Sequence, residues 1–215
     1  MAIEKRVYRE ELWNTSTHAF GLVLSVIGLV LLLIKGIALS SDRYLLSVTI
    51  FGLSLVFVYG SSTVYHWAKD PKRKRLLKTI DHVAIYFLIA GTYTPFTLVT
   101  LQRGPGPSML AAIWSIAIIG TIFKLFFTGR FNLISTLLYV AMGWLSVLVI
   151  KPLIASMDWN GFVLLAAGGV VYTLGVIFYL AERLPYNHAI WHFFVIGGSL
   201  LHFLSIFLYV KPVLR

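Results

Sequence analysis

Seven long apolar runs, separated by short polar segments, constrain the fold of this chain more than any other feature. A helix needs about 20 predominantly apolar residues to cross the hydrocarbon core of a bilayer. The runs of that length are approximately 18–39, 44–67, 79–101, 109–127, 132–153, 161–181 and 188–210. Because the connections are short, helices adjacent in sequence should pack antiparallel. The sequence therefore predicts an all-α integral membrane protein, with one seven-transmembrane-helix domain over residues 1–215.

The composition supports a membrane protein and excludes several kinds of site. Hydrophobic residues make up 59% of the chain and charged residues 12%, whereas soluble domains are about 45–50% apolar and about 25% charged. There is no cysteine, which excludes disulfides, thiolate metal ligands and cysteine nucleophiles. The first apolar run exceeds the roughly 7–15 residues of a signal-peptide core. We therefore interpret it as a retained membrane helix.

The net charge of +10 indicates orientation in the membrane rather than nucleic-acid binding. No basic segment is interleaved with aromatic residues in a soluble domain. With the N-terminus inside, the Lys and Arg residues on the inner side outnumber those on the outer side, as the positive-inside rule requires. The inner set is Lys5, Arg6, Arg9, Lys69, Lys72, Arg73, Lys74, Arg75, Lys78, Lys124, Arg130 and Arg183, and the outer set is Lys35, Arg43, Arg103, Lys151, Lys211 and Arg215. This predicts a cytoplasmic N-terminus and an external C-terminus.

Histidines gather at the inner ends of the predicted helices. His188 and His192 are four residues apart, and residues at this spacing share one face of a helix. Ser62 and His66 repeat the spacing at the end of the second run. The third run begins with Asp81 and His82, and the first begins with Glu11, Asn14 and His18. Five of the six histidines therefore fall in one inner layer.

This layer predicts a metal site. His66, His188 and His192 would supply three imidazoles from two helices, and Zn²⁺ accepts neutral imidazole nitrogen while leaving a fourth position for water. Asp81 could orient that water and accept its proton. Each residue also has a purely structural interpretation: an interfacial histidine pair, Ser62 at a helix contact, and Asp81 as a helix cap. Their location at one depth favours the metal site.

Besides His18, two histidines stand outside the predicted ligand set. His82 follows Asp81 directly and points about 100° away from it on a helix. His202 lies ten residues beyond His192, about 15 Å further along the last helix. We interpret His202 as a buried hydrogen-bonding residue, with the lining of an internal cavity as the alternative.

Three motifs in order resemble those of one known family. They are Glu11-x-x-Asn14-x-x-x-His18, then Ser62-x-x-x-His66 with Asp81 opening the next helix, then His188-x-x-x-His192. Together with Gly91-Thr92-Tyr93-Thr94-Pro95-Phe96 they resemble the hemolysin III branch of the progestin and adipoQ receptor (PAQR) family, in its bacterial members. The resemblance implies Zn²⁺ held by His66, His188 and His192, with Asp81 and Ser62 at positions that hold or flank the zinc-bound water. It also implies a multipass protein of the bacterial plasma (inner) membrane, with its metal site near the cytoplasmic face.

The resemblance implies a reaction as well, because the family is grouped with alkaline ceramidases as metal-dependent lipid amide hydrolases. We therefore expect a zinc-dependent hydrolase of a lipid amide or ester, with a membrane lipid as substrate and no nucleic-acid partner. Asp81 would be the general base and Ser62 a hydrogen-bond donor to the water or oxyanion. Glu11, Asn14 and His18 would surround the metal ligands.

Two other functions remain open from the sequence. The first is a non-catalytic sensor or regulator of membrane lipid, in which zinc is structural. The second is a pore-former or ion carrier that uses Asp81, His192 and His202 as a relay.

Overall fold

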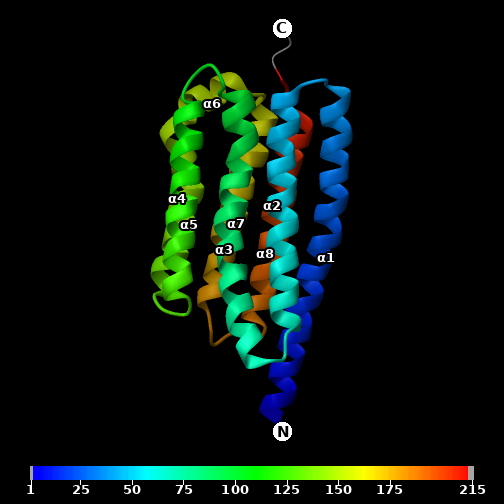
Figure 1. Ribbon diagram of the computed structural model, residues 1–215, viewed down its shortest axis with the longest axis vertical. Helices are drawn as coiled ribbons and strands as arrows, with labels where there is room; N and C mark the ends of the chain where they lie inside the picture. The colour runs from blue at the N-terminus through cyan, green and yellow to red at the C-terminus, as the bar shows by residue number, and fades with distance from the viewer. Residues whose placement is uncertain (1, 213–215) are drawn as a thin grey trace.

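The computed structural model describes residues 2–212, with side chains from residue 6 onward, as a helical bundle without strands in that range (Figure 1). Its elements are α1 (Ala2–Ala38), α2 (Asp42–Trp67), α3 (Pro71–Pro95), the π-helix η1 (Phe96–Thr100), α4 (Gly106–Phe127), α5 (Asn132–Gly143), the 3₁₀-helix η2 (Trp144–Val149), α6 (Ile150–Ser156), α7 (Trp159–Leu180) and α8 (Asn187–Tyr209). Seven helical segments are long and apolar enough to cross a membrane. The prediction of a seven-helix membrane bundle is confirmed.

Two helices begin well before the apolar runs that predicted them. The first begins at Ala2 rather than near residue 18, and an ion pair from Arg6 Nε to Glu10 Oε1 at 2.9 Å supports its exposed turns. The third begins at Pro71 rather than near residue 79. There the Asp70 side chain accepts a hydrogen bond from the Arg73 amide at 2.8 Å, and proline occupies a first-turn position. Apolar runs mark the part of a helix inside the membrane, whereas caps and ion pairs determine where it starts.

Two spans contain irregular turns. After Pro95, which has no amide hydrogen, the third span widens into η1, and the Leu101 amide bonds to the Phe96 carbonyl at 2.8 Å. The fifth span changes from α5 to η2 and then to α6. At this break the Tyr93 hydroxyl lies 2.7 Å from the Gly143 carbonyl and accepts a bond from the Ser146 amide at 2.8 Å. A side chain of α3 thus satisfies backbone groups that lipid could not satisfy.

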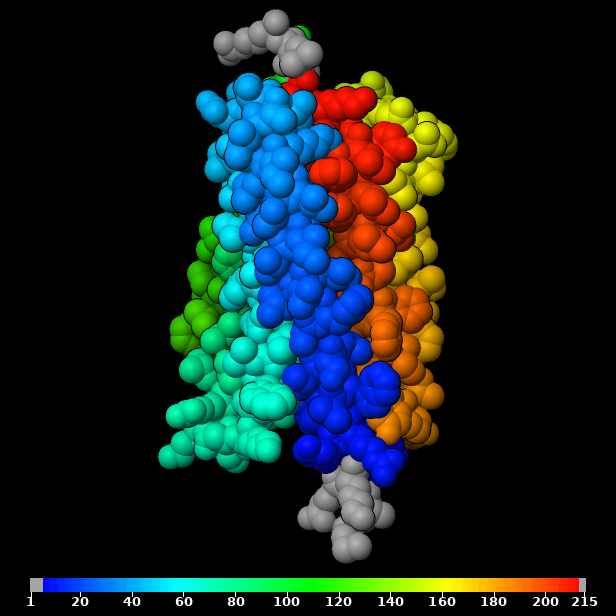
Figure 2. Space-filling model, turned by 90° about the vertical axis from the view of Figure 1, so that its right-hand side faces the viewer, coloured from blue at the N-terminus to red at the C-terminus, as the bar shows by residue number. Residues whose placement is uncertain are grey.

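The third span, which contains α3, is the most buried of the seven. The helix α3 contacts α2, α4 and α5. In the most apolar stretch of this span 72% of the residues are buried, compared with 11% in α7. On the other side of the bundle, α1 packs between α2 and α8, as Figure 2 shows in blue, cyan and orange to red. Large apolar side chains cover the outer faces of the bundle. A surface of this kind suits contact with lipid tails.

One end of the bundle holds most of the polar residues of interest. We call it the histidine end: the end at which α1 begins, α2 ends and α8 begins, at the bottom of Figure 1. His18, His66, His188 and His192 all lie there. Because α1 and α8 begin at this end and α2 ends there, the bundle brings together residues that are up to 174 positions apart, from His18 to His192.

The predicted orientation can be tested directly because the chain has no cysteine. In intact cells, a membrane-impermeant maleimide should label Arg103→Cys, in the turn between η1 and α4, but not Lys72→Cys in the first turn of α3. After the cells are opened, both variants should react equally. Labelling of Lys72→Cys in intact cells would contradict the predicted orientation and indicate the opposite one.

Candidate metal centre

Three histidines converge at the histidine end. One ring nitrogen from each of His66, His188 and His192 lies within 4.8 Å of those of the other two. Ring centroids are 5.0 Å apart for His66 and His188, 5.3 Å for His66 and His192, and 4.6 Å for His188 and His192. His66 and His192 are buried and His188 is partly buried. These three residues, and no other His, Asp or Glu of the described chain, form a group that could hold a metal ion.

Local structure fixes where α8 begins and so places two of these rings. Tyr186, just before the helix, has φ 58°, in the left-handed region that residues other than glycine rarely adopt. Next to it, the Asn187 side-chain amide lies 3.3 Å from the carbonyls of Phe178 and Tyr179, at the end of α7. The first turn of α8 is thereby attached to α7. His188 then lies on the first turn and His192 one turn later, on the same face.

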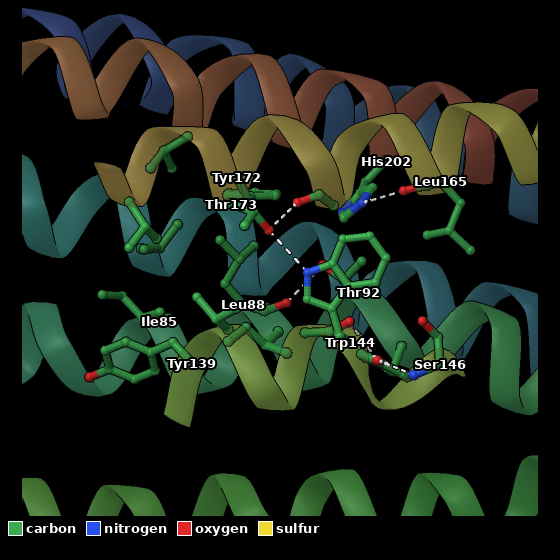
Figure 3. Close-up of a pocket in the computed structure, with 18 of the residues that line it drawn as sticks. Ile85, Leu88, Thr92, Tyr139, Trp144, Ser146, Leu165, Tyr172, Thr173 and His202 are labelled. Atoms are coloured by element: carbon green, nitrogen blue, oxygen red, sulfur yellow. Dashed lines mark hydrogen bonds between the residues drawn. The ribbon is translucent and has the colours of Figure 1, made fainter. Parts of the chain in front are cut away.

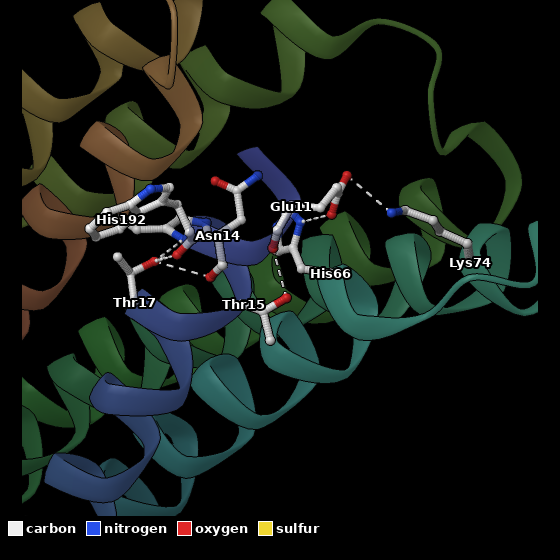
Figure 4. A network of polar contacts seen from close by, with 8 residues as sticks. Glu11, Asn14, Thr15, Thr17, His66, Lys74 and His192 are labelled. Carbon is white, nitrogen blue, oxygen red and sulfur yellow. Dashed lines mark hydrogen bonds and ion pairs between the residues drawn. The ribbon is translucent and has the colours of Figure 1, made fainter. Parts of the chain in front are cut away.

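The His66 ring is held by a carboxylate from α1. His66 Nδ1 lies 2.9 Å from Glu11 Oε2, and the other oxygen of Glu11 lies 3.0 Å from Lys74 Nζ (Figure 4). A carboxylate accepts hydrogen bonds, so Nδ1 of His66 carries the hydrogen and Nε2 carries the lone pair. Glu11 thereby links α1, α2 and α3 around one metal-ligand candidate.

A hydroxyl from α1 holds the His192 ring in the same way. His192 Nδ1 lies 2.9 Å from Thr17 Oγ1, and that hydroxyl also donates to the Trp13 and Asn14 carbonyls, at 2.9 and 3.0 Å. Since the single proton of the hydroxyl is directed to these carbonyls, its oxygen accepts from His192 Nδ1–H. The lone pair of His192 is therefore on Nε2, as it is in His66.

These hydrogen bonds make the cluster fit a metal ion. Among the described residues, His66 Nε2 is buried and has no hydrogen-bond partner, and leaving a buried polar atom unpaired is costly. Metal-binding histidines commonly donate their second N–H to a carboxylate or another oxygen, which fixes the ring and its tautomer. His66 and His192 have this arrangement. The three-histidine group could therefore hold a metal ion with imidazole ligands.

The other α1 residues of the predicted site lie beside the cluster. His18 stacks on His192 with ring centroids 3.4 Å apart and planes inclined by 18°. Both nitrogens of the His18 ring are buried without a hydrogen-bond partner among the described residues, as is Asn14 Oδ1. Glu11 contacts a candidate ligand through a hydrogen bond and His18 by stacking. Asn14 contributes its main-chain carbonyl, which orients Thr17.

Asp81 and Ser62 lie next to the three histidines without belonging to their group. Both line the cavity that His188 and His192 also line. The Ser62 side chain is buried, with 1% exposure, and Asp81 is partly buried. A carboxylate and a hydroxyl thus reach the same space as the metal-ligand candidates.

A largely apolar cavity of about 220 Å³ extends from the histidine end into the bundle. It reaches Leu101, Met109 and Leu153, toward the opposite end. Halfway along its wall, His202 Nε2 lies 3.1 Å from the Leu165 carbonyl, near Tyr172 and Thr92 (Figure 3). His202 is therefore both a buried hydrogen-bonding residue and part of the cavity lining, so the two interpretations of it are compatible.

Thr17 and Lys74 are residues of the centre that the sequence did not identify. Lys74 belongs to a basic run that served only to orient the helices. Thr17 offered one signal, because Asn14, Thr17 and His18 are spaced i, i+3 and i+4 and so share a helix face. Predicting the hydrogen bond to His192 also requires the rotation of α1 about its axis.

The fold and the site together define a class of protein: a seven-helix membrane bundle with a cluster of three histidines, two of them buried, at one end. The family model described as "Haemolysin-III related" matches residues 6–203. The chain belongs to this family, which confirms the resemblance inferred from the motifs.

Individual relatives support the same assignment. The chain is 48% identical to Hemolysin-3 of Bacillus cereus, over 95% of this chain and 93% of that one. It is 46% identical to the Hemolysin-3 homolog of Bacillus subtilis (strain 168), over 95% and 96%. Human monocyte to macrophage differentiation factor is 33% identical over 92% and 83%. No solved structure gave a significant match.

The hydrogen bond that Thr17 accepts from His192 should determine how tightly the candidate centre binds metal. Loss of such a partner typically weakens metal affinity about 10–100-fold, so we expect Thr17→Val to bind metal that much more weakly and Thr17→Ser to restore binding. The measurement is competition with a chelating dye on purified protein. Thr15→Val is the matched control, since Thr15 is buried on the same helix and bonds only to the Glu11 carbonyl. Equal affinities for Thr17→Val and Thr15→Val would contradict the assignment.

Proposed function

We propose that the protein is a zinc-dependent, ceramidase-like hydrolase of a lipid amide or ester. One observation carries the proposal: His188 and His192 of the three-histidine group line the same cavity as Asp81 and Ser62, and that cavity continues as an apolar space between the helices. A metal site at the end of an apolar cavity suits a substrate whose polar bond is attached to a long hydrocarbon chain.

Zinc is the metal that these ligands favour. It is commonly held by neutral imidazole, and three protein ligands leave one coordination position for water or substrate. When bound, Zn²⁺ would supply Lewis acidity, which polarises a carbonyl and makes water more acidic. His66, His188 and His192 would hold it, while Glu11 and Thr17 would keep two of the rings in the ligating tautomer.

Asp81 would move the proton during hydrolysis. Its carboxylate lines the cavity next to the histidines and lies outside the three-histidine group. It would accept a proton from the attacking water and pass it to the leaving amine or alcohol, so that water is divided between an acid and an amine or alcohol product. Ser62, which is buried beside it, would donate a hydrogen bond to the oxygen that becomes negative.

The apolar cavity would hold the hydrocarbon chain of the lipid. Its wall away from the histidine end consists mainly of side chains such as Leu88, Phe96 and Leu165. With the N-terminus in the cytoplasm, the reacting bond would lie near the cytoplasmic face of a bacterial plasma membrane, within reach of lipids of that leaflet. The hydrolysis would then take place inside the membrane.

Zinc content tests the ligand set. Purified wild-type protein should carry about one zinc per chain, measured by elemental analysis, and His188→Ala should lose most of it. His202→Ala is the matched control, because it removes a buried histidine from the same helix and should leave the zinc in place. Retention of zinc in His188→Ala would mean that the metal binds elsewhere.

Hydrolysis of a lipid amide tests the reaction. Reconstituted wild-type protein should release fatty acid from a ceramide or a related lipid amide or ester. Asp81→Asn should retain zinc yet hydrolyse about 10²–10⁴-fold more slowly, the usual contribution of a general base. Full activity of a zinc-loaded Asp81→Asn protein would remove Asp81 from the mechanism.

One observation favours a second function, a lipid sensor with structural zinc. The ligands come from α2 and α8, which both pack on α1 and make few contacts with each other. A metal ion would tie these two helices together. For this function, chelation should lower the thermal unfolding temperature strongly, while Asp81→Asn should keep full cellular activity.

A further inference from the structure

A second polar cluster surrounds Lys124, outside the metal centre. Lys124 lies three residues before the end of α4, where a membrane lysine ordinarily extends its ammonium group to water. Here the side chain is fully buried, with 0% exposure, and within the described chain Nζ has no hydrogen-bond partner. Neither α4 nor α5 contains Asp or Glu. The third surrounding helix, α3, carries one carboxylate, Asp81, which lines the cavity beside Ser62 and His188.

Contacts one turn deeper show how α3, α4 and α5 face each other at this point. The rings of Tyr86 and Tyr139 are 4.6 Å apart, edge to face, and the Tyr139 hydroxyl donates to the His82 carbonyl at 2.9 Å. The Tyr86 ring also lies against Gly120, where a Cβ atom would overlap it. Tyr86, Gly120 and Tyr139 therefore form one layer.

The layer nearer the histidine end holds His82, Lys124 and Ser135. Each is four residues from a member of the first layer, on the same helix face. The helices α3 and α5 begin at the histidine end and α4 ends there. Each four-residue separation therefore leads from the first layer toward the histidine end. Side chains from three helices thus converge at one depth.

The neighbours of Lys124 are unpaired as well. His82 Nδ1, Tyr86 Oη and Ser135 Oγ are buried and have no hydrogen-bond partner among residues 6–212. Two of these atoms are hydroxyl oxygens, which can donate to an acceptor. Lys78 adds a positive charge one turn from His82 on α3. A cation with nearby hydroxyl donors suits an oxyanion.

The position of the cluster indicates where the oxyanion comes from. Both α4 and α5 pack on α3 but make few contacts with each other. At the end of this seam, Phe127 and Phe131 are exposed on the outer surface. A lipid headgroup in the adjacent leaflet would lie at this depth. We propose that Lys124, His82, Tyr86 and Ser135 form a binding site for the phosphate of an anionic phospholipid.

Native mass spectrometry of the full chain in detergent tests this site. The probes are phosphatidylglycerol, phosphatidylcholine and inorganic phosphate, each added to delipidated protein. Wild-type protein should bind one phosphatidylglycerol in preference to phosphatidylcholine. Lys124→Met should weaken that binding at least about tenfold, since it removes a charged hydrogen-bond donor. The matched control is Lys151→Met, an exposed lysine near the opposite end, which should bind like wild type.

Further variants separate loss of the site from loss of the fold. Lys124→Arg keeps the charge and should retain binding, and Ser135→Ala keeps the lysine and should weaken binding less than Lys124→Met does. The zinc content of Lys124→Met should equal that of wild type, which makes this result independent of the proposed hydrolase. Inorganic phosphate bound in a Lys124-dependent manner would support the same oxyanion site with a free anion as its source. Equal phosphatidylglycerol binding by wild type and Lys124→Met, or no binding of any probe, would overturn the proposal.

Discussion

Two hydrogen bonds that histidine rings donate to α1 orient two rings of the three-histidine group. Glu11 Oε2 accepts from His66 Nδ1 and Thr17 Oγ1 accepts from His192 Nδ1, each at 2.9 Å. In the apolar interior there is little water to satisfy an imidazole, so each ring needs a partner for both nitrogens. These bonds occupy one nitrogen per ring and leave the other as a free lone pair. Because α1 packs between α2 and α8, it can orient rings from both helices. Although α1 contributes no predicted ligand, it orients two of the three candidate ligands.

The sequence predicted the architecture because the thickness of a membrane restricts the length of each apolar run. It predicted the meeting of His66, His188 and His192 because their spacing set the helix face, and counting the spans put them at the same end of the bundle. Helix ends were harder. Polar first turns of α1 and α3 are helical outside the apolar runs, and the fifth span changes helix type where Tyr93 bonds to its backbone. Contacts across helices, such as Thr17 with His192, depend on helix rotation, which a spacing rule within one helix does not supply.

The burial of Lys124 is another feature that the sequence did not predict. In the sequence it is one of the basic residues near a helix end, and it contributes to the charge count that orients the chain. In the structure it is fully buried next to unpaired hydroxyls. Both polar clusters are near the histidine end, on opposite sides of α3: the candidate metal centre toward α2 and α8, and the Lys124 cluster toward α4 and α5. A lipid hydrolase with a headgroup site of this kind would sense the leaflet from which it takes its substrate.

The most direct test of the metal centre is X-ray absorption at the zinc edge of purified, zinc-loaded protein. Three imidazole nitrogens at about 2.0–2.1 Å and one further light atom are expected, in four-coordinate geometry. Replacing His66 with Ala should reduce the imidazole scattering to that of two rings. A spectrum without imidazole scattering, or one unchanged in His66→Ala, would contradict the assignment of His66, His188 and His192 as the ligands.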